Sequence, residues 1–229
     1  MDKFLSVAML PVVLTLGAYQ VGLLCQKKLR SPLANPILIA VGLVILFLLV
    51  SGMEPEVYQK GTASISWLMT PATICLAIPM YEQTLLLRKH FRAIAAGIAS
   101  GALSCLALVL VCCVALGFER ELAVSLLPKS ITSAIGVPLG ELYGGLGAIT
   151  TTAIILTGIF ASVLAVPLCK CFRLEDPVSR GVALGTSGHV IATAKAGELD
   201  PLTGAVSSLS LVVAGLLTSV VFPLVVSLL

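Results

Sequence analysis

The chain has 229 residues, of which 58% are hydrophobic and 11% are charged, and its mean hydropathy is +1.10. A water-soluble fold is excluded, because apolar runs of this length and density are typical of helices that cross a bilayer. We therefore predict an all-α fold, a polytopic membrane helical bundle that residues 1–229 form as a single domain. The net charge of +3 is small and its cations stand in short clusters between apolar runs, so nucleic-acid binding is also excluded.

Apolar runs and broken segments alternate along the chain. In chain order, the predicted membrane helices are 4–24, 36–50, 93–117, 149–168 and 202–228. Three shorter segments that mix apolar residues with Gly, Pro, Ser and Thr lie between them, at 65–82, 123–141 and 182–196. In lipid, the backbone groups freed by such breaks must face protein or a watery cavity, and broken helices of this kind commonly form transporter sites. We expect discontinuous or re-entrant helices in these three segments.

The basic residues predict which loops lie in the cytoplasm, because short loops rich in Lys and Arg stay on that side. The clusters are Lys27, Lys28 and Arg30; Arg88, Lys89 and Arg92; and Lys170, Arg173 and Arg180. All three clusters are cytoplasmic only if the region 123–147 enters and leaves the membrane on one side. This re-entrant loop is our expectation, and it predicts an external amino terminus. The side of the carboxyl terminus depends on whether 182–196 crosses or re-enters.

Two of the broken segments resemble each other. Segment 70–82 lies over segment 129–141 without a gap, and the identical pairs are Thr73 and Thr132, Pro79 and Pro138, and Glu82 and Glu141. A chance likeness between two small-residue helices and a structural repeat both explain this match. In a repeat, the paired helix ends would offer backbone N–H groups to an anionic substrate.

The chain contains no sequence signature of an enzyme site: no P-loop, dinucleotide fingerprint, HExxH or serine nucleophile elbow is present. Most of its seven cysteines lie inside apolar runs, where they act as small apolar residues rather than as a disulfide framework. We expect no enzyme activity, no cofactor and no metal site.

The run 183–196 places a histidine, a lysine and several hydroxyls in an apolar setting, and such groups usually line a path or a site in a membrane protein. His189 could bind a carboxylate or carry a proton, and the alternative is a structural histidine that is hydrogen-bonded between helices. Lys195 could serve the site if the helix breaks at Gly188. Otherwise its side chain reaches an interface near Glu198.

A second polar run lies at the mouth of the broken segment 123–141. Lys129 precedes Ser130 and Thr132, and an ammonium there would favour a small anion, although an interfacial anchor explains it equally well. Arg180 is more typical of a cytoplasmic anchor than of a ligand. Asn35, which precedes Pro36, is more typical of a helix start than of a ligand.

Six ordered motifs in this chain resemble those of the LrgB/CidB family, the larger subunits of the bacterial LrgA/LrgB and CidA/CidB membrane pairs. The motifs are Asn35-Pro36, Pro71 to Tyr81, Leu127 to Ser133, Ile155 to Gly158, Arg180 to His189, and Ala205 to Leu209. The likeness covers nearly the whole chain and looks closest to the YohK branch of the family. The chain departs from the family pattern at Ser133-Ala134, where Thr-Pro is usual, and at Gly188 and Lys195, where Ser and Arg are commoner.

The resemblance implies two different functions. Some family members are described as holin-like or antiholin-like modulators of murein hydrolase activity and cell lysis, which act beside a small LrgA or CidA partner. Others are described as carriers of small monocarboxylates, with pyruvate as the substrate in bacteria and glycolate or glycerate in plastids. The broken segments and their polar residues favour the carrier, because a pore modulator needs oligomerising helices instead.

We therefore predict a multi-pass protein of the bacterial inner membrane that moves a small carboxylate anion together with a small LrgA/CidA-like membrane protein. The alternative is an antiholin-like modulator of lysis without transport activity. The expected substrate-binding residues are Lys129, Ser130, Thr132, Thr186, Ser187, His189 and Asn35, and His189 is also the expected proton carrier. Whether the chain forms a homo-oligomer is left open by the sequence.

Overall fold

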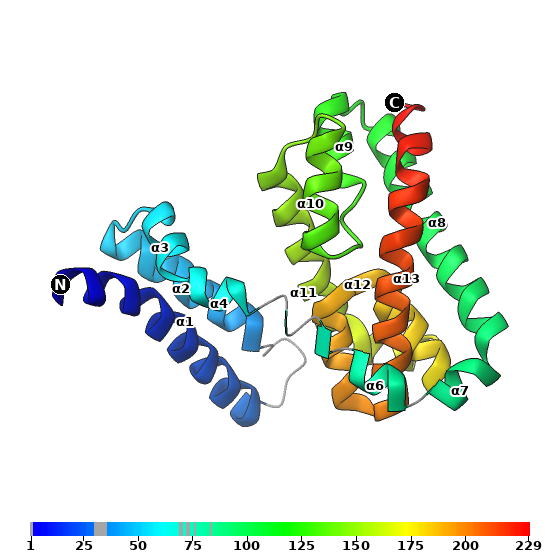
Figure 1. Ribbon diagram of the computed structural model, residues 1–229, viewed down its shortest axis with the longest axis horizontal. Coiled ribbons are helices and arrows are strands. Elements are labelled where there is room, and N and C mark those ends of the chain that lie inside the picture. The colour runs from blue at the N-terminus through cyan, green and yellow to red at the C-terminus, as the bar shows by residue number, and fades with distance from the viewer. Residues whose placement is uncertain (1, 30–35, 69–70, 72–73, 76, 83) are drawn as a thin grey trace. The chain divides into compact units, whose positions relative to one another are not determined.

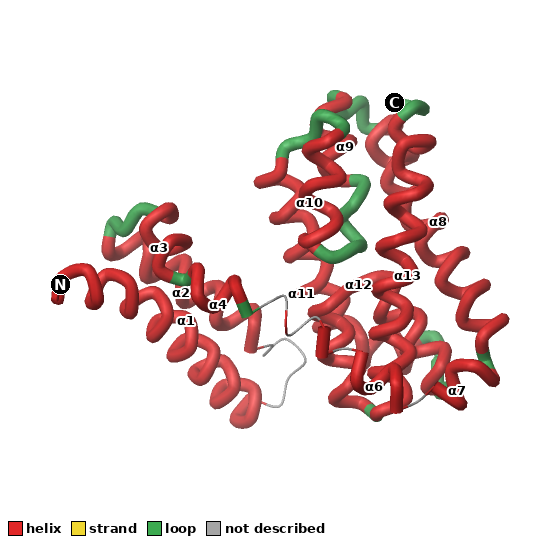
Figure 2. Tube along the Cα trace, viewed as in Figure 1, coloured by secondary structure: helices red, strands yellow, loops and turns green. Residues whose placement is uncertain are grey.

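The computed structural model describes residues 2–29, 36–68, 71, 74–75, 77–82 and 84–229. Every regular element in these ranges is an α-helix, which confirms the predicted fold class (Figure 2). The contacts divide the chain into two compact units, unit 1 from Met1 to Cys75 and unit 2 from Leu76 to Leu229. That the two units act as a single domain stays a prediction.

Unit 1 consists of α1 (Asp2–Leu29), α2 (Pro36–Ser51), α3 (Pro55–Gly61) and α4 (Ala63–Trp67). Helices α1 and α2 pack closely at Gly22, where a Cβ atom would lie 2.9 Å from the Cα atom of Pro36. Helix α3 is tied to α1 by a hydrogen bond of 2.7 Å between the hydroxyls of Thr15 and Tyr58.

Unit 2 contains α6 (Ala77–Glu82), α7 (Thr84–Lys89), α8 (Phe91–Ala115), α9 (Arg120–Leu126), α10 (Ser133–Leu142), α11 (Gly147–Cys171), α12 (Pro177–Leu199) and α13 (Pro201–Val226). Helices α8, α11 and α13 are long and apolar enough to cross a membrane, and so is Met9–Lys28 within α1. Helix α2 is apolar but has only 16 residues. These five helices match the five predicted spans in position, and four of them are long and apolar enough to cross a membrane. The protein is a multi-pass membrane protein.

Helices α9 and α10 form a short hairpin in the segment predicted to be re-entrant. They have 7 and 10 residues, so each is far shorter than the roughly 20 residues that a span requires. Pro128 follows α9 and cannot continue it, because proline lacks the backbone N–H. The backbone N–H of Leu146 donates a 2.7 Å hydrogen bond to Oγ of Ser125, which fixes the start of α11 beside α9.

The α9–α10 hairpin lies at the end of unit 2 where α8 and α13 finish (Figure 1). One buried apolar cluster joins the last turns of α8 and α13 to α9, and its members are Leu106, Val109, Cys113, Ala123, Val124, Leu127, Phe222 and Val226. The chain therefore enters and leaves this hairpin near one end of the unit, as the re-entrant prediction requires.

Helix α12 also reverses direction. Gly188 (φ −129°) and His189 (φ 42°) have non-helical backbone angles in its middle. A straight helix of 23 residues would separate its ends by about 33 Å. Instead, the hydroxyl of Thr203, just beyond the end of α12, donates a 3.2 Å hydrogen bond to the carbonyl of Pro177, at its start. Helix α12 is thus a second hairpin with its tip at Gly188 and His189.

The two hairpins approach each other from opposite ends of α11. The first adjoins the start of α11, while the base of the α12 hairpin shares a pocket with Cys169 and Lys170 at the other end. The segment 182–196 therefore has the geometry of the re-entrant alternative, and a break at Gly188 is confirmed. Helix α13 then returns toward the end where α8 finishes.

Glycines allow α12 and α13 to pack backbone to backbone. A Cβ atom on Gly181 would lie 2.8 Å from the carbonyl oxygen of Thr203, and one on Gly185 would contact the carbonyl oxygen of Ser207. Small residues four apart are a common device for close helix packing in membranes. The hydroxyls of Thr193 and Ser207 add a buried hydrogen bond of 2.8 Å between α12 and α13.

The proposed internal repeat falls only partly within the described residues. Thr70 and Thr73, at the start of its first copy, lie outside them. In the first copy, residues 77–82 form helix α6. Their counterparts in the second copy, residues 136–141, lie within α10, so both copies end in a short helix with a proline. The repeat stays a prediction.

We predict that Gly185→Ala lowers the stability of the folded protein by about 1–3 kcal/mol, because the new methyl group overpacks the contact between α12 and α13. Gly197→Ala is the matched control on α12, since no atom of the described residues lies within 4 Å of the Cβ atom it would add. The control should be neutral or stabilising by about 0.5–1 kcal/mol. Thermal unfolding in detergent measures both, and equal effects would contradict the packing argument.

We also predict a pH-dependent cap at the start of α12. The backbone N–H and the hydroxyl of Ser179 each donate a 2.8 Å hydrogen bond to Oδ2 of Asp176, and these bonds, the backbone one foremost, hold the pKa of Asp176 below its ordinary value. A carboxylate with a lowered pKa stabilises the fold above its unfolded pKa of about 3.9, and this stabilisation is lost as the pH falls through the folded value.

The measurement compares the thermal unfolding of the wild type and Asp176→Asn between about pH 6 and pH 3. Asparagine keeps an acceptor for the cap but does not titrate. The wild type should lose more stability than the variant toward the acid end, and parallel curves would show that the cap does not depend on ionisation.

Candidate functional site

A pocket of about 660 Å³ lies where the tips of the two hairpins meet α8 and α11. We call it the central pocket. Most of its apolar wall comes from α11, and its polar wall consists of Cys105, Lys129, Ser130, Thr157, Thr186 and Ser187. Polar side chains from four separate elements thus converge in an apolar surround, which is the usual composition of a small-molecule site.

The central pocket brings together four of the seven predicted site residues, namely Lys129, Ser130, Thr186 and Ser187. Thr132 is buried and precedes α10, but it does not line the pocket. His189 is also buried and lies off the pocket wall. Asn35 lies outside the described residues.

Lys129 lies in the turn between α9 and α10, and the only hydrogen bonds of its ammonium in the described part of the chain are long. Its ammonium donates to Oγ of Ser130 over 3.4 Å and to Sγ of Cys105 over 3.8 Å. Oγ of Ser130 and Sγ of Cys105 lie 2.9 Å apart and share a hydrogen bond of their own. No carboxylate among the described residues lies within ion-pair distance of Lys129. The ammonium therefore keeps donor capacity and an uncompensated positive charge.

Two hydroxyls of α12 form the opposite side of the polar wall. Thr186 donates to the carbonyl of Val182 over 2.7 Å, and Ser187 donates to the carbonyl of Ala183 over 2.6 Å. In this state both oxygens offer lone pairs, and each hydroxyl must rotate to donate to an anion. Gly101 of α8 leaves room for Thr186, because a Cβ atom there would lie 3.1 Å from its Oγ1.

His189 reaches from the tip of the α12 hairpin to the backbone of α11. Its Nε2 lies 2.8 Å from the carbonyl oxygen of Ile154. A carbonyl can only accept, so Nε2 carries the proton, and Nδ1 holds the lone pair when the ring is neutral. A Cβ atom on Gly158 would lie 2.6 Å from Cε1 of the ring, so only glycine admits the imidazole here.

Sequence reasoning did not select three residues of this site, namely Cys105, Thr157 and Gly158. Cys105 was expected to be a small apolar residue, but its thiol contacts Ser130 in the pocket. The spacing of Gly97, Gly101 and Cys105 along one face of α8 was a signal for close packing there. Gly158 lies in a motif that we noted, but its contact with His189 joins α11 to α12 and follows from no local pattern.

Lys195 does not join the central pocket. Its ammonium forms a 2.7 Å ion pair with Glu198, and its side chain is 26% exposed. The structure therefore agrees with the alternative that Lys195 reaches an edge of the fold.

Comparison with known proteins gives a consistent picture. The model of the LrgB-like family matches residues 15–228. The holin-like protein CidB of Staphylococcus epidermidis is 33% identical over 226 residues, which cover 99% of this chain and 98% of that protein. The antiholin-like protein LrgB of Bacillus mycoides and that of Bacillus cereus are each 35% identical over 214 residues, 93% of either chain. No solved structure matches the chain.

We predict that Gly158→Ala breaks the hydrogen bond between His189 and Ile154, because its methyl group would occupy the space of the imidazole. The expected loss of stability is about 1–3 kcal/mol. In a His189→Ala background the ring is absent, so the same substitution should cost clearly less. Thermal unfolding of the four proteins in this cycle measures the coupling, and additive effects would show that the contact contributes nothing.

Proposed function

The chain belongs to the LrgB-like family, and we propose that it carries small monocarboxylate anions, of the pyruvate, glycolate or glycerate class, across the bacterial inner membrane. The central pocket is the substrate site in this proposal. The relatives named above are called holin-like and antiholin-like proteins rather than enzymes, and no catalytic role is part of the proposal.

The observation that carries this proposal is the environment of Lys129. A positive charge inside a membrane bundle is costly unless an anion or strong acceptors accompany it. The nearest acceptors of Lys129 are a thiol and a hydroxyl at long distance, and the described residues offer it no carboxylate. A bound carboxylate would supply the missing negative charge.

The arrangement of the two hairpins gives further support. Their tips meet at one pocket although they approach from opposite ends of α11. Secondary transporters commonly bind substrates between broken helices near the middle of the membrane. Helix α10 begins at Ser133, four residues after Lys129, and among the described residues its N-cap Thr132 makes no side-chain cap hydrogen bond, so the positive end of the helix would add to the attraction for an anion.

Lys129 and Ser130 hold the carboxylate from the first hairpin in this proposal, while Thr186 and Ser187 face it from the second. Thr132, the N-cap residue of α10, is kept as a further proposed ligand. Asn35, also selected from the sequence, lies outside the described residues. His189 is the proposed proton carrier. Its Nε2–H donates to Ile154, so Nδ1 is the nitrogen that would take up a proton.

The proposal includes a small LrgA/CidA-like membrane protein as the partner. It follows from the family resemblance, and exposed apolar side chains beside the central pocket, such as Phe160 at 62%, offer a surface that either lipid or a partner helix could cover. Assembly of several copies of this chain is the alternative arrangement.

A second function is favoured by the names of the relatives, which are called holin-like or antiholin-like proteins. In that case the chain modulates murein hydrolase activity and lysis without carrying substrate. The two functions differ in what they require of Lys129 and His189. A carrier needs the chemistry of both side chains, while a modulator needs only the fold.

We predict that vesicles containing the purified chain take up labelled pyruvate, glycolate or lactate in a saturable manner, alone or with the partner. Lys129→Ala should lower the uptake efficiency by about 10-fold to 100-fold, because it removes a hydrogen bond to a charged group. His189→Ala should also lower uptake, and its rate should lose its dependence on a proton gradient.

Lys195→Ala is the control for the loss of a cation, since Lys195 lies away from the central pocket and pairs with Glu198. It should retain uptake close to that of the wild type. Saturable uptake that survives Lys129→Ala would contradict the proposed site. A folded wild type that takes up nothing, with or without the partner, would favour the modulator.

A further inference from the structure

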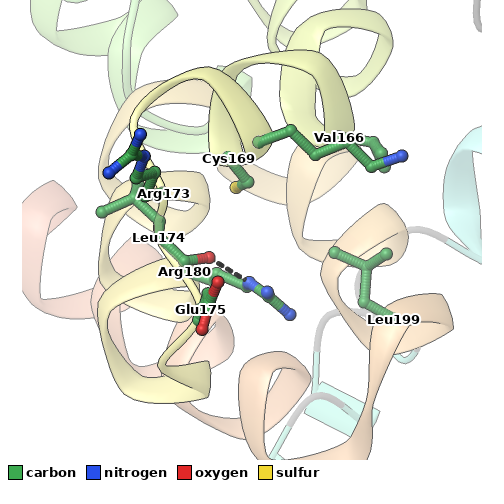
Figure 3. Close-up of a pocket in the computed structure, with 8 residues that line it drawn as sticks. Val166, Cys169, Arg173, Leu174, Glu175, Arg180 and Leu199 are labelled. Atoms are coloured by element: carbon green, nitrogen blue, oxygen red, sulfur yellow. Dashed lines mark hydrogen bonds between the residues drawn. The ribbon is translucent and has the colours of Figure 1, made fainter.

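A second pocket, of about 380 Å³, lies at the base of the α12 hairpin (Figure 3). We call it the basal pocket. Its charged side chains are Lys170 at the end of α11, Arg173 and Glu175 in the following loop, and Arg180 in the first turn of α12. Leu174 and Leu199 contribute to its apolar wall.

Among the described residues, the basal pocket carries more positive than negative charge. Three cations line it together with one carboxylate, that of Glu175. Among the described residues, neither Glu175 nor any other carboxylate forms an ion pair with these cations. The neighbouring carboxylate of Asp176 accepts two hydrogen bonds from Ser179 instead. An anion is therefore attracted to this pocket.

Arg180 is held in a fixed orientation. Its Nε donates a 2.5 Å hydrogen bond to the carbonyl oxygen of Leu174. Figure 3 shows the side chain extending from this bond toward Leu199. The terminal nitrogens of a guanidinium form a planar fork that matches the oxygens of a phosphate group. The fixed Nε leaves that fork directed into the pocket.

The basal pocket lies where an apolar helix ends. Helix α11 is long enough to span the hydrocarbon region, and its last turn supplies Cys169 and Lys170. Lipid phosphates lie just beyond that region. Large apolar side chains are exposed nearby, with Leu168 at 45% and Phe172 at 70%. A phosphate bound by the cations would thus leave its acyl chains beside apolar surface.

We propose that the basal pocket binds the phosphodiester group of an anionic phospholipid, with Lys170, Arg173 and Arg180 holding the phosphate. Free inorganic phosphate carries the same chemistry and would meet the same cations. It would gain nothing from the exposed apolar surface along α11, and this difference assigns the site to lipid. The inference is independent of what the central pocket carries.

The experiment titrates the purified full chain in detergent with phosphatidylglycerol, phosphatidylcholine or inorganic phosphate. Bound lipid is counted by native mass spectrometry, and the unfolding temperature is followed in parallel. Phosphatidylglycerol should bind about 10-fold more tightly than phosphatidylcholine and raise the unfolding temperature, since nearby cations favour a net negative headgroup. Inorganic phosphate should do neither at the same concentration. Equal binding of both lipids, or an equal effect of phosphate alone, would overturn the proposal.

The variant is the double substitution Lys170→Gln with Arg173→Gln, which leaves the hydrogen bond of Arg180 intact. It should weaken phosphatidylglycerol binding by about 10-fold or more and leave phosphatidylcholine binding unchanged. The matched control is Arg88→Gln with Lys89→Gln, which removes two cations from the last turn of α7. If the two double substitutions weaken phosphatidylglycerol binding equally, the lipid responds to the net charge of the protein alone, and its assignment to the basal pocket is wrong.

Discussion

The reversal of α12 at Gly188 and His189 is the constraint on which the rest of unit 2 depends. A non-glycine residue at positive φ is strained by roughly 1–3 kcal/mol, and His189 has φ 42°. The strain is offset by the hydrogen bond from His189 to the backbone of α11 and by the close packing of both arms against α13. Because the tip and the base belong to one hairpin, this reversal sets the position of Thr186 in the central pocket and of Arg180 in the basal pocket.

Small residues make this arrangement compatible with an apolar surround. Buried hydroxyls on α13, such as those of Ser208 and Ser210, donate to the carbonyls four residues earlier in their own helix. They are thereby satisfied without polar partners across the interface, and they take up little space. Gly185 on α12 then approaches the side chain of Ser210 closely. The small serine and glycine residues of α12 and α13 therefore make this interface both polar in composition and tightly packed.

The two pockets of unit 2 differ in how their cations are held. Lys129 lies in the turn between two short helices, where the break after α9 exposes it to the central pocket. The cations of the basal pocket stand at and beyond the end of α11, a helix long and apolar enough to cross a membrane. A cation within the bundle requires a specific anion, whereas cations at the edge are already hydrated. The first arrangement suits a substrate that binds and leaves, and the second suits a permanent component of the membrane.

The sequence by itself determined the helices and where they break. Runs of apolar residues long enough to span a bilayer predict α8, α11 and α13 within a few residues, because length and hydropathy are local properties. The break near Gly188 and the polar turn at Lys129 are local as well. Polar groups are rare in such an apolar chain, and this rarity, together with the family resemblance, selected the four predicted site residues that line the central pocket, Lys129, Ser130, Thr186 and Ser187.

Only the tertiary structure decided that these residues share one pocket and that α12 folds back on itself. It also placed Cys105 beside Lys129 and fitted the imidazole of His189 against Gly158. These contacts join residues far apart in the chain, and they depend on the crossing of helices rather than on the pattern within any one of them. A glycine in an apolar run leaves room for a close neighbour, but only the packed structure shows which group that neighbour is.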